Sequence, residues 1–332
     1  MLITNEIHPQ RAKILSENIE RMGISNAIVL NETPESLSKR FIAFFDRILV
    51  DAPCSGEGMF RKNDNAGEEW SEENVALCAE RQDGILDCAA TMLKPGGRLV
   101  YSTCTFAPAE DEGSVSRFLE THPDFCLEKE ERLMPHKIKG EGHFLAVLHR
   151  EGGQLSSAAT AGTEKSLTLK DCREFLDFAK EALTIPAEEL TEGKILLRFG
   201  EQLYLAPAET PSLRGLKVLR PGLHLGTVKK NRFEPSHALA LFLKKEQVVH
   251  AVNLVCDGTA VRKYLEGQTL TIGEGCDVEM AHIITRGRMA AEQADVSLPK
   301  GWCLVCVDGY SLGWGKAAGA VLKNHYPKGL RK

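Results

Sequence analysis

Two cysteines in short polar segments are the residues of this 332-residue chain best suited to covalent chemistry. The segment DAPCSG contains Asp51 and Cys54, and the segment STCT contains Cys104. A thiolate adds readily to an electron-poor carbon and leaves readily, so it can split one difficult step into two easier ones. An acid nearby can stabilise charge or help to move a proton. The residue types therefore predict nucleophilic catalysis by a cysteine.

Both cysteines follow predicted strands of an α/β sheet. Residues 47–50 form a compact apolar run, and residues 98–102 form the next one. Further strand and helix patterns alternate at residues 2–5, 8–22, 27–30, 34–41 and 72–93. The alternation predicts a parallel, doubly wound, Rossmann-like sheet. Since ligands bind outside the carboxyl ends of its strands, Glu6, residues 51–62 and residues 103–112 are expected to converge on one crevice.

The character of the sequence changes after a last predicted strand at residues 140–149. Residues 151–166 are rich in Gly, Ser, Ala and Thr, which is typical of a linker. Short strand-like runs separated by Gly and Pro follow, and they predict mixed, mostly β modules. The expected divisions are a catalytic domain at 1–150, the linker at 151–166, a small α/β module at 167–233 and a last module at 234–332.

Composition limits the class of protein. The net charge is -5, so any nucleic acid must be bound by local basic patches. We find neither a run of about 18 apolar residues nor a secretion signal, so we expect a cytoplasmic protein without a membrane partner. The ten cysteines are then expected to be reduced thiols. Cys303 and Cys306 have C-x-x-C spacing without a second ligand pair, so we expect strand residues and no metal.

The segments around the two cysteines carry a family resemblance. DAPCSGEGMFRK and KPGGRLVYSTCTFAPAEDE resemble the two signature blocks of the RNA cytosine-C5 methyltransferases of the Sun family, and within it the bacterial RsmF branch. The likeness extends through Asn5 and Glu6 at one end and KNHYPKGLRK at the other, and so covers nearly the whole chain. The resemblance implies transfer of a methyl group from S-adenosylmethionine to a cytosine of RNA, and the expected RNA is ribosomal RNA, free or in a ribosomal subunit.

The chemistry of such a reaction explains why a thiol is needed. Cytosine C5 is a poor nucleophile, and addition of a thiolate to C6 turns the ring into an enamine that attacks a methyl group. By resemblance to the family, Cys104 is the nucleophile and Cys54 assists product release. Asp51 matches the acid beside the methionine end of the cofactor and the target base, and Glu6 matches the acid that binds the cofactor ribose.

Further positions are assigned to ligands by their place in the pattern. Thr33 lies after the third predicted strand, where the family often has an acid that contacts the adenine; Glu32 or a backbone amide could replace that acid. Lys62 follows the first block and is expected to hold a phosphate or orient Asp51. Two basic stretches are candidate RNA contacts. The first contains Arg214, Lys217, Arg220, Lys229, Lys230 and Arg232, and the second, in a terminal PUA-like module, contains Lys316, Lys323, His325, Lys328, Arg331 and Lys332.

One part of the family pattern is not found. The family has a strand and a glycine-rich cofactor loop before the ribose-binding acid, whereas the first glycine of this chain is Gly23, beyond Glu6. The strand would lie centrally, between those that end at Glu6 and Asp51, so its absence is expected to expose two strand edges. We expect that the sequence begins downstream of the native start or that this chain does not bind S-adenosylmethionine alone.

Other interpretations of the same residues stay open at this point. A cysteine at a strand end is often packing material, and Pro-Cys-Ser-Gly can be a tight turn. Asp51 can cap a loop, Glu6 can be a solvated charge, and basic runs are often solvated faces. The main functional alternative is an RNA-binding fragment with impaired catalysis. A DNA cytosine methyltransferase, with Cys54 as nucleophile, and a thiol redox enzyme are more distant alternatives.

Overall fold

The structure is a computed structural model, and it describes residues 1–61, 70–153, 162–273, 275–278, 283–286, 288–289 and 300–331. Lys62, Lys332 and residues 154–161 of the expected linker lie outside these ranges. The chain divides into two compact units. Unit 1 contains Met1–Asn31 and Thr163–Lys332, and unit 2 contains Glu32–Gly162. Each unit is described by itself.

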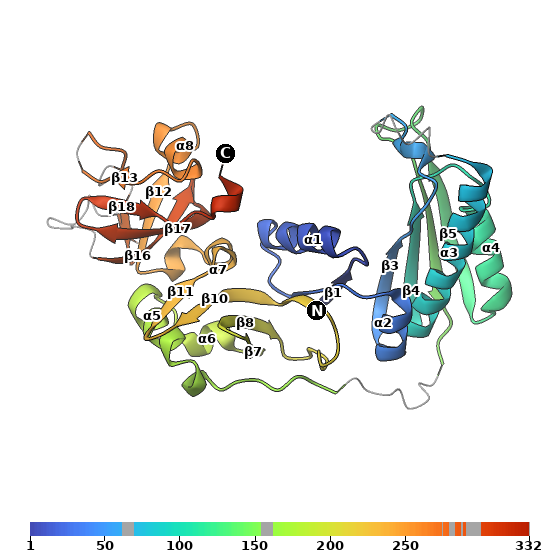
Figure 1. The fold of residues 1–332 in the computed structure, drawn as a ribbon, viewed down its shortest axis with the longest axis horizontal. Coiled ribbons are helices and arrows are strands. Elements are labelled where there is room, and N and C mark those ends of the chain that lie inside the picture. The colour runs from blue at the N-terminus through green and yellow to red at the C-terminus, as the bar shows by residue number, and fades with distance from the viewer. Residues whose placement is uncertain are drawn as a thin grey trace. The chain divides into compact units, whose positions relative to one another are not determined.

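Unit 2 is a four-stranded sheet with helices packed against it. Its order is β3-β4-β6-β5, in which β3 and β4 are parallel while β6 is antiparallel to β4 and β5. Helices α3 and α4 lie side by side against the sheet (Figure 1). The elements are α2 (Pro34–Arg40), β3 (Phe45–Asp51), η1 (Glu57–Met59), α3 (Glu72–Met92), β4 (Leu93–Thr103), α4 (Glu112–Thr121), β5 (Phe125–Leu133) and β6 (His143–Arg150). The last strand expected, at residues 140–149, is therefore present as β6, and it pairs with β5.

Local sequence explains where these elements begin. Thr33 precedes α2 and accepts a hydrogen bond from the Ser36 backbone N–H, and Ser71 caps α3 in the same way. The apolar run in β3 and β4 builds a buried core with Phe118 and Phe144. Strand β4 begins before the run expected at residues 98–102, and Gly96 within it adopts a positive φ of 77°. The core holds the carboxyl ends of β3 and β4 next to each other.

Unit 1 combines the first residues of the chain with everything after the linker. Three sheets have the orders β1-β2-β9, β11-β10-β8-β7 and β13-β18-β17-β16-β12-β14-β15. The first elements are β1 (Leu2–Asn5), α1 (Pro9–Arg21) and β2 (Ala27–Leu30). Those that follow are η2 (Leu169–Asp171), α5 (Arg173–Ala182), α6 (Ala187–Thr191), β7 (Lys194–Phe199), β8 (Gln202–Pro207), β9 (Val218–Pro221), β10 (Leu223–Lys229), β11 (Arg232–Pro235), α7 (His237–Phe242) and η3 (Lys245–Gln247). The last are β12 (His250–Leu254), α8 (Thr259–Leu265), β13 (Leu270–Thr271), β14 (Ile283–Thr285), β15 (Arg288–Met289), β16 (Gly301–Val307), β17 (Tyr310–Ala318), β18 (Val321–Asn324) and η6 (Lys328–Leu330).

The mixed α/β class is confirmed, but the strands expected in one sheet lie in two. β1 and β2 are parallel, as expected, and β2 then pairs with β9 rather than with a strand of unit 2. Among the described residues, β1 and β3 each stand at the edge of their sheet, which agrees with the two exposed strand edges expected from the sequence. Leu49 of β3 is 70% exposed. The crevice expected to join Glu6 with the cysteine segments is not formed by one sheet.

The boundary expected at residue 233 falls inside β11, which pairs with β10. Phe175 and Phe178 of α5 share a buried core with Trp314 of β17, so the two expected C-terminal modules pack together. The expected strand residues Cys303 and Cys306 are confirmed, since both lie buried in β16. In the described part of the chain, no helix is both long and apolar enough to cross a membrane.

Arg220 of the first basic stretch has a structural role. Its side chain is buried, forms an ion pair with Glu20 of α1, and donates to the Ser16 hydroxyl at 3.2 Å. We expect Arg220→Ala to lower the free energy of unfolding by about 2 to 3 kcal/mol, since it leaves a half-buried carboxylate unpaired. Urea unfolding measures the loss. Arg214 belongs to the same stretch but is exposed, so Arg214→Ala is the control. Equal losses of unfolding free energy in both variants would contradict the structural role of Arg220.

Candidate active site

The two cysteines predicted to react are in contact in unit 2. The Sγ atoms of Cys54 and Cys104 lie 3.3 Å apart, although 50 residues separate them in the chain. The Cys104 backbone N–H also donates to Cys54 Sγ at 3.3 Å. Both residues are partly accessible, between buried and exposed. The contact arises because β3 and β4 are parallel neighbours, with Asp51 opposite Ser102 in the register.

Their contact gives the two thiols different acidities. A hydrogen bond from Cys54 stabilises the Cys104 thiolate and lowers the pKa of Cys104 to about 7, although burial and the charges of Asp51 and Glu110 oppose the shift. The pKa of Cys54 is raised, first by that hydrogen bond and then by burial. One thiolate and one thiol are therefore the stable state of the pair near neutral pH, with the charge on Cys104.

The turn after Cys54 packs directly on the Cys104 segment. The Gly58 backbone N–H donates to the Cys104 carbonyl oxygen at 2.9 Å, and a Cβ on Gly58 would approach that oxygen to 2.8 Å. The Glu57 carboxylate accepts from the Phe106 backbone N–H and from the Trp70 indole N–H, both at 2.9 Å. Only glycine fits this close approach of two backbones.

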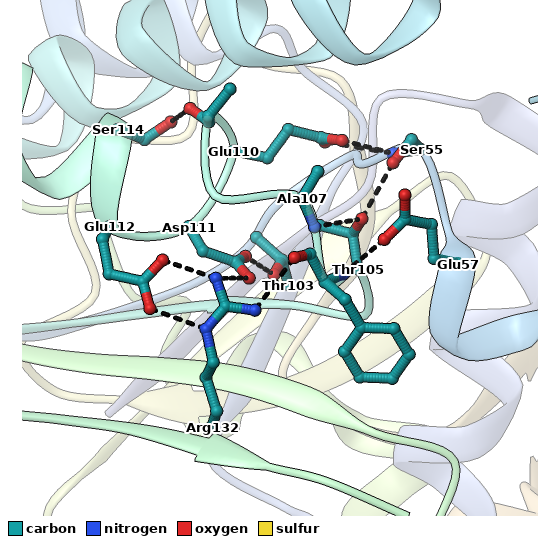
Figure 2. A network of polar contacts seen from close by, with 12 residues as sticks. Ser55, Glu57, Thr103, Thr105, Ala107, Glu110, Asp111, Glu112, Ser114 and Arg132 are labelled. Atoms are coloured by element: carbon teal, nitrogen blue, oxygen red, sulfur yellow. Dashed lines mark hydrogen bonds and ion pairs between the residues drawn. The ribbon is translucent and has the colours of Figure 1, made fainter. Parts of the chain in front are cut away.

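A buried acid, Glu110, links the Cys54 segment to helix α3. Its carboxylate accepts from the Ser55 backbone N–H at 3.0 Å and from Gln82 Nε2 at 2.9 Å. Gln82 also donates to the Pro53 carbonyl oxygen at 2.9 Å. Ser55 and Thr105 are joined through their hydroxyl groups at 2.8 Å (Figure 2). The two cysteine segments are thus tied both to each other and to the helix.

A second buried acid, Asp111, faces the strand before Cys104. It accepts from the Thr103 hydroxyl at 2.6 Å and lies 3.2 Å from Arg132 Nη2 (Figure 2). Burial raises the pKa of Asp111 to about 7. Arg132 also donates from Nε to Glu112 at 2.6 Å, which lowers the pKa of Glu112. The sequence reasoning missed Glu110 and Asp111, although both lie within the second signature block.

The residues assigned to the cofactor are not brought together in one unit. Asp51 is exposed at the end of β3 in unit 2, and Thr33 caps α2 there. Glu6 belongs to unit 1, where its carboxylate accepts from the His8 backbone N–H and pairs with Arg11 at 3.0 Å. The Glu6 carboxylate thus contacts residues at the start of α1 (Pro9–Arg21), and its side chain is 16% exposed.

Some of the candidate RNA contacts already form an ion pair within the chain. In the first stretch Lys229 pairs with Glu201, and the exposed Arg232 pairs with Glu234. Arg214 and Lys230 are also exposed. In the second, Lys323 and Lys328 are exposed. Arg331 donates to the Tyr326 carbonyl oxygen at 3.0 Å, and Lys316 lies 5.1 Å from the centre of the Trp302 ring. Two aromatic residues lie close to this second stretch in the sequence: Trp314 is buried in the core, and Tyr310 is 81% exposed.

Comparison with known proteins relates this arrangement to a family. Residues 1–149 match the family described as 16S rRNA methyltransferase RsmB/F. Residues 177–243 match the first C-terminal domain of RsmF rRNA methyltransferases, and residues 286–332 match the RsmF PUA domain. The chain resembles the RsmB/F rRNA methyltransferases in all three segments. The three matches follow one another along the chain, so the resemblance inferred from the two cysteine blocks is confirmed.

Individual relatives resemble this chain along its whole length. Ribosomal RNA small subunit methyltransferase F of Shewanella sp. (strain W3-18-1) is 27% identical over 356 residues, which cover 100% of this chain and 68% of the relative. The protein of the same name from Shewanella piezotolerans is 27% identical over 355 residues, covering 100% and 69%. A solved structure of NSun6 from Pyrococcus horikoshii with SFG is 29% identical, has a TM-score of 0.41, and covers 46% of this chain and 41% of its own.

Proposed function

We propose that this chain carries the thiol pair with which a cytosine of ribosomal RNA is methylated at C5. The observation that carries the proposal is the 3.3 Å contact between Cys54 and Cys104 Sγ, which leaves both sulfur atoms close enough to serve one pyrimidine ring. The exposed Lys323 and Lys328, in the segment that matches a PUA domain, support RNA as the partner.

Cys104 is the nucleophile in this proposal. With a pKa of about 7, a large fraction of Cys104 is thiolate near neutral pH. The sulfur forms a bond to C6 of the cytosine, and the electron pair of the C5–C6 double bond moves to C5, which becomes nucleophilic. Asp51, at the end of the neighbouring strand, is assigned to the polar edge of the base.

Cys54 completes the reaction after methyl transfer. While Cys104 is a thiolate, its charge and hydrogen bond hold Cys54 in the thiol form. Once Cys104 sulfur is bonded to C6 that charge is gone, so Cys54 ionises more easily and accepts the C5 proton. The C5–C6 double bond then forms again and Cys104 leaves as a thiolate. The coupling between the thiols thus assigns them successive roles.

S-adenosylmethionine is the cofactor of this chemistry, and it supplies an electrophilic methyl group. Glu6, Thr33 and Asp51 are the positions assigned to it, but the first lies in unit 1 and the others in unit 2. Neither unit by itself contains all three positions assigned to the cofactor. The steps above therefore use side chains of unit 2 alone. We place the reaction in the cytoplasm, on ribosomal RNA or a ribosomal subunit, and assign Lys62 to a phosphate.

RNA that contains 5-fluorocytosine tests the assignment of the nucleophile. Fluorine at C5 does not leave as a proton does, so the sulfur–C6 bond persists and the peptide that carries it can be identified by mass spectrometry. With S-adenosylmethionine present, we expect the adduct on Cys104 and none with Cys104→Ala. Cys126→Ala, which removes an exposed thiol of β5, is the matched control and should keep the adduct.

Each other outcome of this trapping experiment has a definite meaning. An adduct on Cys54 would reverse the roles and match the chemistry of a DNA cytosine methyltransferase. RNA binding without any adduct would refute the proposed function and favour the RNA-binding fragment.

A further inference from the structure

The polar network beneath the thiol pair contains two adjacent acids that face different cysteine segments. Glu110 and Asp111 are both 0% exposed. Glu110 reaches the Cys54 segment through the Ser55 backbone N–H, 55 residues away in the chain. Asp111 reaches the end of β4 through the Thr103 hydroxyl, one residue before Cys104. Figure 2 shows the two carboxylates pointing toward Ser55 and Thr103 respectively.

Burial of two carboxylates is costly and needs a reason beyond packing. A buried charge destabilises a fold unless it is hydrogen-bonded, and apolar side chains often replace such groups without loss of stability. Asp111 lies at the N-cap of α4, yet its side chain makes no capping hydrogen bond. Its carboxylate is turned instead toward Thr103. The hydrogen bonds of both acids therefore serve the cysteine segments rather than the helix that follows them.

The backbone of the acid pair is itself fixed. Tyr101 is a buried residue of β4, and its hydroxyl donates to the Glu110 carbonyl oxygen at 2.7 Å. Gln82 holds the Glu110 carboxylate from α3 and accepts from the Ser114 hydroxyl at 3.0 Å. Glu110 is thus held by hydrogen bonds from the sheet and from α3, and Gln82 of α3 is itself bonded to α4.

We propose that Glu110 and Asp111 are positioning residues that hold the Cys54 and Cys104 segments at reacting distance, one acid for each segment. The inference rests on the proposed function for the roles of the two thiols, but it concerns their mutual geometry. Its test therefore measures the reactivity of the thiols directly and requires neither RNA nor cofactor.

The pH midpoint of Cys104 alkylation distinguishes positioning from a simple charge effect. If Glu110 acts only through its negative charge, Glu110→Gln removes a charge that opposes the Cys104 thiolate, and the midpoint falls below that of the parent. If Glu110 positions Cys54, the amide of glutamine faces the Ser55 or Gln82 donor, the hydrogen bond from Cys54 is lost, and the midpoint rises. The two explanations predict opposite signs.

We expect the midpoint to rise from about 7 toward the ordinary thiol value of roughly 8.5, which slows alkylation of Cys104 at pH 7 roughly tenfold. Thr103→Val, which removes the hydroxyl held by Asp111, should raise it as well. Glu112→Gln is the matched control, because Glu112 pairs with Arg132 and contacts neither cysteine segment in the described bonds. Its midpoint should stay at the parent value.

Thermal unfolding of each variant separates positioning from loss of fold. Should Glu110→Gln not fold, Gln82→Met removes the amide that joins Glu110 to Pro53 and is measured in the same way. A midpoint that stays or falls in the folded variants would overturn the proposal. Absence of an RNA adduct in the parent chain, with a raised midpoint in Glu110→Gln, would instead refute the proposed function and leave positioning intact.

Discussion

Iodoacetamide at pH 7 is expected to modify Cys104 at least roughly tenfold faster than Cys54 in the folded chain. The thiolate is the form that reacts. The pKa of Cys104 is lowered to about 7 by the hydrogen bond from Cys54, whereas the pKa of Cys54 is raised by the same bond and by burial. Peptide mapping by mass spectrometry, at a series of short times, gives both rates from one sample.

The pH dependence of this reaction has a definite sign. Alkylation of Cys104 should increase as the pH rises through about 7 and become constant above it, since the thiolate is the deprotonated form. Asp51 and Glu110 are the acids whose charges oppose that thiolate. Asp51→Asn should therefore move the midpoint to lower pH, whereas Asp46→Asn, at the other end of β3 and paired with Lys94, should leave it unchanged.

A different order of reactivity would remove the basis of the proposed roles. If Cys54 were labelled first, the hydrogen bond between the sulfur atoms would point the other way and the thiolate would reside on Cys54. Equal rates with an ordinary midpoint would mean that the 3.3 Å contact is not maintained in solution. Cys126 serves as the internal reference, because it is exposed on β5.

The thiol pair could be predicted from the sequence because it depends on local signals. An apolar run followed by a polar turn marks the carboxyl end of a buried strand, and two such ends in succession favour parallel neighbours. The register that sets Asp51 beside Ser102 then brings Cys54 and Cys104 together. The caps at Thr33 and Ser71 likewise depend on a few residues only.

The partner of β2 could not be predicted in this way. Ala27–Leu30 is fully buried, and its apolar residues predict a strand but do not select a neighbour. Its pairing with β9 joins residues near 28 to residues near 220, and the Glu20–Arg220 ion pair stabilises the same packing. Arg220 was interpreted as part of an RNA-binding stretch because sequence composition does not reveal that a distant acid will neutralise it.

Glu110 and Asp111 were missed for a related reason. Acids in a polar loop before a helix are usually solvated, and a negative charge is favoured near a helix start in any case. Their burial depends on Gln82, which is 28 residues from Glu110, and on Arg132 from β5. The signal available in the sequence was position: two acids directly follow the second cysteine segment inside one signature block.

Mild oxidation of the folded chain with diamide is expected to join Cys54 and Cys104 in a disulfide before any other pair reacts. The diamide takes up two electrons and two protons, one from each thiol. The Sγ atoms start 3.3 Å apart, and a disulfide bond measures about 2.05 Å, so only a small movement closes it. The Cys104 thiolate available near pH 7 adds to the N=N bond of diamide. The Cys54 sulfur then gives up its proton and displaces the resulting hydrazine from the Cys104 sulfur, which closes the disulfide. Mass spectrometry of unreduced peptides detects the linked pair.

The second pair of closely spaced cysteines supplies the contrast. Cys303 and Cys306 are buried in β16, and burial raises the pKa of Cys306 to about 11, so they should stay reduced at the same dose. Dithiothreitol should restore the thiols of Cys54 and Cys104, and with them the ability of the chain to form the RNA adduct. Covalent dimers through Cys126 or Cys256, formed while Cys54 and Cys104 remain free, would show that the two segments do not hold their sulfur atoms in contact.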